Sequence, residues 1–199
     1  VIIDWVANHT GWDHVWTKTH PEYYLHDADG KFHIASGMDD IIELDYSNPE
    51  MRMAMIDAMK FWVRETNIDG FRCDMAEMVP VEFWHWAIEE VKRSYPEIIF
   101  IAEVYNPQLY RDYIHFGGFD FLYDKVGMYD TLRNIIGGYQ PATSISNAWQ
   151  CTNDIQGNML HFLENHDEQR IASSFFASDA QKAFPAAMVS SLLTQAPFM

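Results

Sequence analysis

Three acidic residues and one arginine have types and positions that suit acid–base chemistry. Arg72 and Asp74 lie in the stretch FRCDMAE, Glu103 directly follows the apolar run IIFIA, and Asp167 lies in ENHD, after NMLHFL. Charged groups beside a buried strand are costly unless they are paired or take part in a reaction. Carboxylates gathered near an arginine suit glycoside hydrolysis, in which one carboxylate is ionised at the anomeric carbon and another protonates the leaving oxygen.

The expected strand around Asp74 predicts how these groups cooperate. Because side chains alternate along a strand, Arg72 and Asp74 should point to the same face. We expect the charge and hydrogen bonds of Arg72 to keep Asp74 ionised. We expect burial and neighbouring carboxylates to raise the pKa of Glu103. A retaining enzyme would hold the Asp74 and Glu103 carboxyl groups about 5–5.5 Å apart.

Composition excludes several partners. The 199 residues are 48% hydrophobic, enough for a sizeable core, and the net charge is −16. Such an acidic chain repels phosphate backbones, so no nucleic-acid partner is expected. No apolar run reaches the length of a membrane span, so no membrane partner is expected. Cys73 and Cys151 form neither a disulfide framework nor a metal cluster.

The elements that must position these residues alternate between short apolar strands and amphipathic helices. We expect a helix after Asn48, which can cap it, with an apolar face that includes Trp62. The expected strands are 1–6, 68–74, IIFIA, DFLYD, NMLHFL and 197–199, and the expected helices are SNPEMRMAMIDAMKFWVRE, VEFWHWAIEEVKR, 109–115, MYDTLRNII, 171–176 and 180–194.

This alternation favours a parallel sheet, either an open doubly wound sheet or a (β/α)₈ TIM barrel. No Gly-rich phosphate fingerprint supports the open sheet. Six strands are expected where a barrel has eight, and the chain opens on VIIDWVANHT and stops at LLTQAPFM. We therefore expect an incomplete barrel, about strands 3 to 8, from a longer protein. Residues 1–199 would be part of one catalytic domain, with residues 10–45 as an inserted loop subdomain.

Four segments in this order resemble the signature regions of the α-amylase family, glycoside hydrolase family thirteen. DWVANH is similar to the first region, GFRCDMAE to the second, AEVYN to the third and ENHD to the fourth; IIELDYSNP resembles a further family segment. The resemblance spans nearly the whole chain. It implies a retaining glycosidase that cleaves α-1,4-glucosidic bonds in starch-like glucans through a covalent glycosyl-enzyme.

The resemblance also implies residue roles. Asp74 would be the nucleophile, Glu103 the general acid/base and Asp167 a transition-state stabiliser, while Arg72 would pair with the nucleophile. The substrate-binding candidates that it implies are His9 and His166. Tyr105 is a further candidate to line a sugar subsite, with plain packing equally open. Asp4 and Asn8 match the first region, in which Asn8 is a candidate calcium ligand; a hydrogen-bonded turn is the alternative there.

Two features leave the subfamily open. Many α-amylases carry Lys-His where this chain has Glu77-Met78, and the second segment is closer to the cyclomaltodextrinase and neopullulanase branch. A transglycosylase, or a member active on α-1,6 bonds, cyclodextrin or pullulan, is therefore the alternative. A non-catalytic glucan-binding protein is the alternative of another class, but all three carboxylate positions are filled. Secreted, periplasmic and cytoplasmic locations all remain open.

Overall fold

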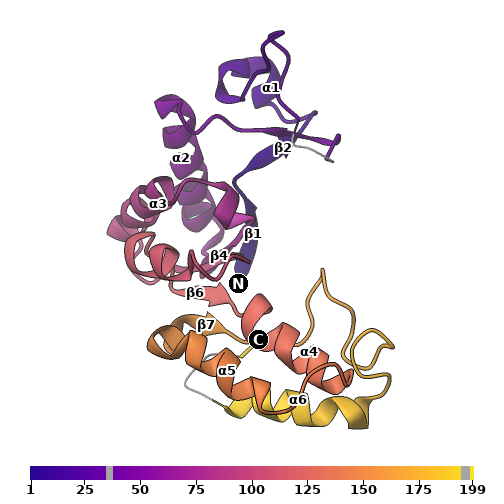
Figure 1. The fold of residues 1–199 in the computed structure, drawn as a ribbon. Coiled ribbons are helices and arrows are strands. Elements are labelled where there is room, and N and C mark those ends of the chain that lie inside the picture. Colours follow the sequence, from indigo (N-terminus) through magenta and orange to yellow (C-terminus); the bar gives the residue numbers. More distant parts are fainter. Residues whose placement is uncertain (35–37, 194–197) are drawn as a thin grey trace. The chain divides into compact units, whose positions relative to one another are not determined.

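The computed structural model describes residues 1–34, 38–193 and 198–199. The chain forms two compact units, one of Val1–Glu103 with His115–Phe119 and one of Val104–Ile114 with Asp120–Met199. Figure 1 shows how strands and helices alternate along each. None of the helices in the described ranges has both the length and the apolar character needed to cross a membrane.

The first unit is built on three parallel strands, with β4 in the middle. They are β1 (Ile2–Val6), β4 (Gly70–Asp74) and β5 (Ile99–Ala102). The strand β4 is buried except at its last residue, as the sequence predicts. A side chain at Gly70 would collide with the carbonyl oxygen of Ile99, so a glycine is needed for the close approach of β4 and β5. The strand β1 is not the buried strand that its apolar residues predict, because among the described strands it pairs on one side only and exposes Ile2 and Val6.

Two helices, α2 (Pro49–Thr66) and α3 (Val81–Ser94), lie side by side in this unit (Figure 1). Asn48 caps α2 by accepting hydrogen bonds from the first-turn amides, as its sequence predicts. The expected apolar face is confirmed except at Trp62, which is 42% exposed. On α3, Trp84 is fully buried, and its indole N–H donates to the carbonyl of Ala76 at 3.0 Å. This bond ties α3 to the turn that follows β4, in which the 3₁₀ turn η2 (Ala76–Met78) lies.

The segment between β1 and α2 contains more regular structure than a loop. It holds an antiparallel pair, β2 (His9–Gly11) and β3 (Ile41–Glu43), with α1 (Trp16–Thr19) and the 3₁₀ turn η1 (Pro21–Tyr23) between them. Tyr24 is buried and forms an isolated bridge with Leu44. Strands of three residues give too short a pattern to be recognised in sequence, since alternation needs about four or more residues.

Among its described residues, the second unit contains two parallel strands, five helical segments and the first part of a further one. They are β6 (Phe121–Tyr123), β7 (Met159–Leu160), η4 (Lys125–Tyr129), α4 (Asp130–Ile136), α5 (Ser144–Cys151), η5 (Asn153–Asn158) and α6 (Ala180–Leu192), and the π-helix η3 (Asp112–Phe116) runs on into the first unit. The predicted helix over 171–176 is wrong: these residues form successive turns, because a short run with two serines offers local bonds that compete with a helix. The helix α5 was not predicted. Thr194, the last residue of the expected helix 180–194, and Pro197, the first of the expected strand 197–199, lie outside the described residues. Phe198 forms an isolated parallel bridge with His161.

Candidate active site

The carboxyl ends of β1, β4 and β5 bring charged side chains together in the first unit. Asp4 lies opposite Arg72 in the β1–β4 register, and Cys73 lies opposite Ala102 in the β4–β5 register. Glu103 follows directly, and its amide donates to the carbonyl of Cys73 at 3.0 Å. Because the strands are parallel, their last residues lie at one edge, where catalytic groups gather in barrel enzymes.

Arg72 is the centre of this cluster and is only 6% exposed. Its Nη1 donates to Asp4 Oδ1 at 2.9 Å and to Asp74 Oδ1 at 2.5 Å, and its Nη2 lies 3.1 Å from Glu103 Oε1. One buried guanidinium thus contacts three carboxylates, and its planar fork of N–H donors holds them in fixed directions, which the rotating donors of a lysine ammonium would not do. The sequence predicts the contact with Asp74 through strand alternation. The contacts with Asp4 and Glu103 depend on the register of three strands.

Glu103 is buried and held by the turn after β4. Its side chain is 10% exposed, and its Oε2 accepts a hydrogen bond from the amide of Met75 at 2.9 Å. Its backbone carbonyl accepts from the amide of Ala76 at 3.1 Å. Met75 has φ +44°, a left-handed conformation that is costly for a residue with a side chain. This strained turn aims an N–H at the carboxylate and fixes its orientation.

The pKa of Asp74 is raised, although the sequence alone predicts that Arg72 keeps this residue ionised. Burial raises the pKa of Asp74 above its ordinary value, and the negative charges of Glu103 and Asp4 raise it further. The hydrogen bond and the positive charge of Arg72 lower the pKa but do not outweigh these effects. Arg72 therefore limits a rise in the pKa of Asp74 and does not hold it below the ordinary range. The pKa of Asp74 is therefore closer to neutral pH than the pKa of an exposed aspartate.

His9 begins β2, opposite Glu43. Burial lowers the pKa of His9, although the charges of Asp74, Asp40 and Glu43 act in the opposite direction. The imidazole is therefore neutral around pH 7, and its Nδ1 is buried without a hydrogen-bond partner among the described residues. A neutral ring within the field of Asp74 can donate one hydrogen bond and accept another. Contact between His9 and a sugar stays a prediction.

Asn8 is buried, and its backbone carbonyl accepts from the amide of Leu44 at 3.1 Å. Its side-chain Nδ2 is buried without a partner in the described part of the chain. A calcium site needs six to eight oxygen ligands. Across residues 1–34, 38–193 and 198–199, no three His, Cys, Asp or Glu side chains gather into a cation site. Backbone carbonyl and side-chain amide oxygens also bind calcium, so the role of Asn8 as a calcium ligand stays a prediction, and calcium enters no step proposed below.

The other candidate residues, Tyr105, His166 and Asp167, lie in the second unit. His166 Nε2 lies 3.1 Å from Asp167 Oδ2, and both side chains are at least half exposed. The side-chain oxygen of Asn165 accepts from the amides of Asp167 and Glu168 at 3.0 and 2.8 Å, forming a local turn.

This turn is anchored by its last residue. Glu168 pairs with Lys125 at 3.0 Å and accepts from the hydroxyl of Tyr129 at 2.7 Å. The Lys125 ammonium also lies 5.9 Å from the centre of the Tyr105 ring. Lys125 thus connects Tyr105 to Glu168, the neighbour of Asp167 in the sequence, within one unit. Because the two units are described separately, the convergence of Asp167 with the Arg72 cluster stays a prediction.

Comparisons with known proteins place the chain in a family. The family model described as "Alpha amylase, catalytic domain" matches residues 19–198. An α-amylase from Lactobacillus plantarum is 29% identical with a TM-score of 0.86, covering 100% of this chain and 50% of its own. A maltogenic α-amylase from Thermotoga neapolitana is 32% identical with a TM-score of 0.82, covering 100% of this chain and 45% of its own.

The names of other similar proteins describe a different activity, glycosyl transfer. The α-1,4-glucan:maltose-1-phosphate maltosyltransferase of Rhodospirillum rubrum is 35% identical over 101 residues, which are 47% of this chain and 14% of that protein. The enzyme of the same name from Myxococcus xanthus is 28% identical over 171 residues, covering 77% of this chain and 24% of that protein. The chain thus spans about half or less of the proteins that it resembles. With its parallel strands and helices arranged as in those α-amylases, the chain belongs to the α-amylase family and forms part of its TIM-barrel catalytic domain.

Proposed function

We propose that the protein carrying this chain is a retaining glycosidase that cleaves α-1,4-glucosidic bonds in starch-like glucans. One observation carries the proposal. A single buried guanidinium lies within 2.5 Å of an Asp74 oxygen and 3.1 Å of a Glu103 oxygen, at the ends of neighbouring strands. Two carboxyl groups held this closely suit attack and proton transfer at the same glycosidic bond.

The chemistry has two halves. In the first, Asp74 attacks the anomeric carbon while Glu103 gives its proton to the leaving oxygen, so that one C–O bond forms and another breaks. In the second, Glu103 takes a proton from water, and the oxygen of that water displaces Asp74. Two inversions leave the anomeric configuration unchanged. Asp167 and His166 would bind sugar hydroxyl groups from the turn that Glu168 anchors.

The contacts of Glu103 hold its carboxyl group in one orientation. Its Oε2 is occupied by the amide of Met75, while its Oε1 faces Arg72. A fixed carboxyl group loses little entropy when the substrate arrives, which favours reaction at one oxygen of the scissile bond. His9, neutral through burial, is suited to hydrogen-bond the same sugar.

Substitution of the two carboxylates tests the proposal. We expect Asp74→Asn and Glu103→Gln to lower kcat on a maltooligosaccharide by roughly 10³-fold or more, in the protein that carries this chain. The matched controls are Asp57→Asn on the exposed side of α2 and Glu97→Gln, and both should leave kcat unchanged. NMR of the first-formed product should show retained anomeric configuration. Inverted product, or near-normal turnover of either active-site variant, would remove the proposed mechanism.

Glycosyl transfer is the second candidate, and it is favoured by the names of the curated relatives. The sequence also has Glu77-Met78 where many α-amylases carry Lys-His, and Met78 is 53% exposed. Transfer shares the glycosyl-enzyme at Asp74 and differs only in what releases it, since a sugar hydroxyl replaces water.

The acceptor decides between the two activities. The experiment compares amylose, pullulan, cyclodextrin and maltose 1-phosphate as donors, each with and without added maltose. Reducing ends that accumulate in proportion to cleaved bonds indicate hydrolysis. Chains that lengthen without new reducing ends indicate transfer. No change in any donor, with glucan binding retained, would favour a non-catalytic glucan-binding protein.

A further inference from the structure

The second unit contains a pocket that none of the candidate active-site residues lines. A cavity of about 450 Å³ opens between the end of α4, the turns over 174–178 and the first turn of α6. Arg133 and Lys182 are among its lining residues, with the side chains of Ser174, Ser178 and Asn134. The described residues that line it include two cations and no carboxylate, in a chain whose net charge is −16. The local charge is thus opposite to that of the protein as a whole.

Arg133 has a close aromatic contact and a distant carboxylate partner. The Arg133 guanidinium carbon lies 4.6 Å from the centre of the Phe175 ring, a cation–π contact that fixes its position. Among the described residues, the closest carboxylate is that of Asp130, 4.0 Å away, and it pairs more closely with Lys125 at 2.9 Å. A weakly neutralised guanidinium is well suited to bind an anion at two oxygens.

Lys182 lies in the first turn of α6 and is exposed. Asp179, the acid that precedes it by three residues, caps the helix by accepting from the backbone amide of Lys182 at 2.7 Å. This bond occupies a carboxylate oxygen with the backbone. The Lys182 ammonium, for which the described residues show no ion pair, can then contribute its charge to the cavity.

An aromatic ring completes the pocket. Tyr139 is 83% exposed, which is unusual for so large a ring. Its ring lies against the backbone of Gly137, where an added Cβ would stand 2.7 Å from the nearest ring carbon. Gly137 thus leaves room for the ring on the rim of the cavity. A flat exposed aromatic ring is a surface on which the apolar face of a sugar can stack.

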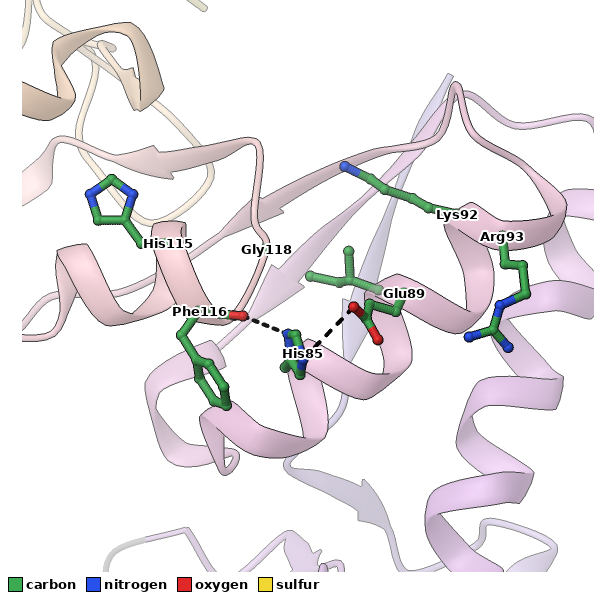
Figure 2. A pocket seen from close by; sticks show the side chains of 9 residues that line it. His85, Glu89, Lys92, Arg93, His115, Phe116 and Gly118 are labelled. Carbon is green, nitrogen blue, oxygen red and sulfur yellow. Dashed lines mark hydrogen bonds and ion pairs between the residues drawn. The ribbon is translucent and has the colours of Figure 1, made fainter.

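A second basic pocket provides a contrast. A cavity of about 490 Å³ between α3 and the segment 115–118, at and after the end of η3, also has cations, Lys92 and Arg93 (Figure 2). There Arg93 pairs with Glu90, and Glu89 in the lining lies 3.8 Å from the ring nitrogen of His85. Figure 2 shows Glu89 turned toward His85 and Arg93 pointing away from the loop. Carboxylates already neutralise this pocket, so it carries no comparable inference.

We infer that the pocket at Arg133 and Lys182 binds a phosphorylated sugar. The phosphate monoester would be held by the two cations and the hydroxyl groups of Ser174 and Ser178, and the sugar ring would stack on Tyr139. A phosphate dianion matches two cations without an accompanying carboxylate. None of the residues that line this pocket is assigned a role in the proposed reaction.

Calorimetric titration of the protein that carries this chain tests the inference, with glucose 6-phosphate, inorganic phosphate and maltose as probes. We expect glucose 6-phosphate to bind most tightly. The double variant Arg133→Gln with Lys182→Gln should weaken its binding by roughly tenfold or more. The control, Lys18→Gln with Arg64→Gln, removes the same charge from other surfaces and should leave binding unchanged. Gly137→Ala should displace the Tyr139 ring and weaken the sugar phosphate but not inorganic phosphate.

Circular dichroism checks that each variant folds. If the double variant does not fold, Lys182→Gln alone replaces it in the titration, because Lys182 is exposed. Equal weakening by the pocket and control variants would reduce the effect to net charge and overturn the inference. Maltose binding as tightly as glucose 6-phosphate would overturn the role of the phosphate. Inorganic phosphate binding as tightly as the sugar phosphate would overturn the role of Tyr139. Absence of binding by all three probes would remove the site.

Discussion

Removal of Arg72 is the most informative perturbation, because one side chain contacts three carboxylates. Replacement by Gln keeps a polar group of moderate size but removes the charge. Asp74 and Glu103 then lose the cation that contacts both of them, and their side chains are only 21% and 10% exposed. Asp4 contributes little to the destabilisation, because its side chain is 52% exposed and water screens its charge.

The expected magnitude follows from this burial. Removing one partner of a buried ion pair costs about 3–5 kcal/mol, because the other charge stays buried. Arg72 lowers the pKa of Asp74 in the native protein, so its loss should raise that pKa further. Both the hydrogen bond and the positive charge of Arg72 act in this direction, so the variant loses both effects at once.

The sign of the pH dependence is determined by the same shift. A carboxyl group whose pKa is higher in the folded state than in the unfolded state is harder to ionise when folded. The folded state therefore loses stability as pH rises from the unfolded pKa, about 3.9 for Asp, through the raised folded pKa. The destabilisation of Arg72→Gln should be small in acid and grow toward neutral pH.

Two assays check these expectations. Urea unfolding at pH 4.5 and 7.5 gives the free energy of unfolding, and the pH profile of kcat/KM on a maltooligosaccharide gives the acidic limb of the free enzyme. The limb should move to higher pH in Arg72→Gln and by less in Arg72→Lys, which keeps a charge. Arg64→Gln on the surface of α2 should change neither. An unmoved acidic limb, or an equal loss of stability at both pH values, would refute the electrostatic role of Arg72.

Three further predictions follow from the described contacts. Asp74→Asn should leave the free energy of unfolding at pH 7 unchanged or higher, because the pKa of Asp74 is raised by burial and its charge is a net cost; clear destabilisation in urea would contradict this. Burial raises the pKa of the fully buried Cys73 thiol, so iodoacetamide should label the exposed Cys151 in the native protein and leave Cys73 unmodified, as mass spectrometry can check. Burial lowers the pKa of His161, but the carboxylate of Asp124, 3.4 Å away, and a backbone carbonyl outweigh it and raise the pKa. Its stabilising charge should be fully present below about pH 6.5 and lost as pH rises through the raised pKa, and His161→Asn should flatten that part of the stability profile.

Local patterns predict much of this fold because they depend on neighbouring residues. Asn48 and Pro49 mark the start of α2, and apolar spacing identifies the buried faces of α2 and α3. The strand with Arg72 and Asp74 is recognised in the same way. The hairpin of β2 and β3 is not, because its strands are three residues each and pair across about thirty residues of chain. The turns over 171–176 resist prediction because serine side chains offer alternatives to helical bonds.

The sequence by itself determined the family and the parallel α/β architecture, and it predicts which residues take part in catalysis. These properties depend on residue type and on spacing within single segments. Only the tertiary structure decided that Arg72 contacts Asp4 and Glu103 as well as Asp74, because the register of three strands sets those distances. It also decided the direction of the Asp74 pKa shift, since burial and the charges of distant residues are summed only in the folded chain.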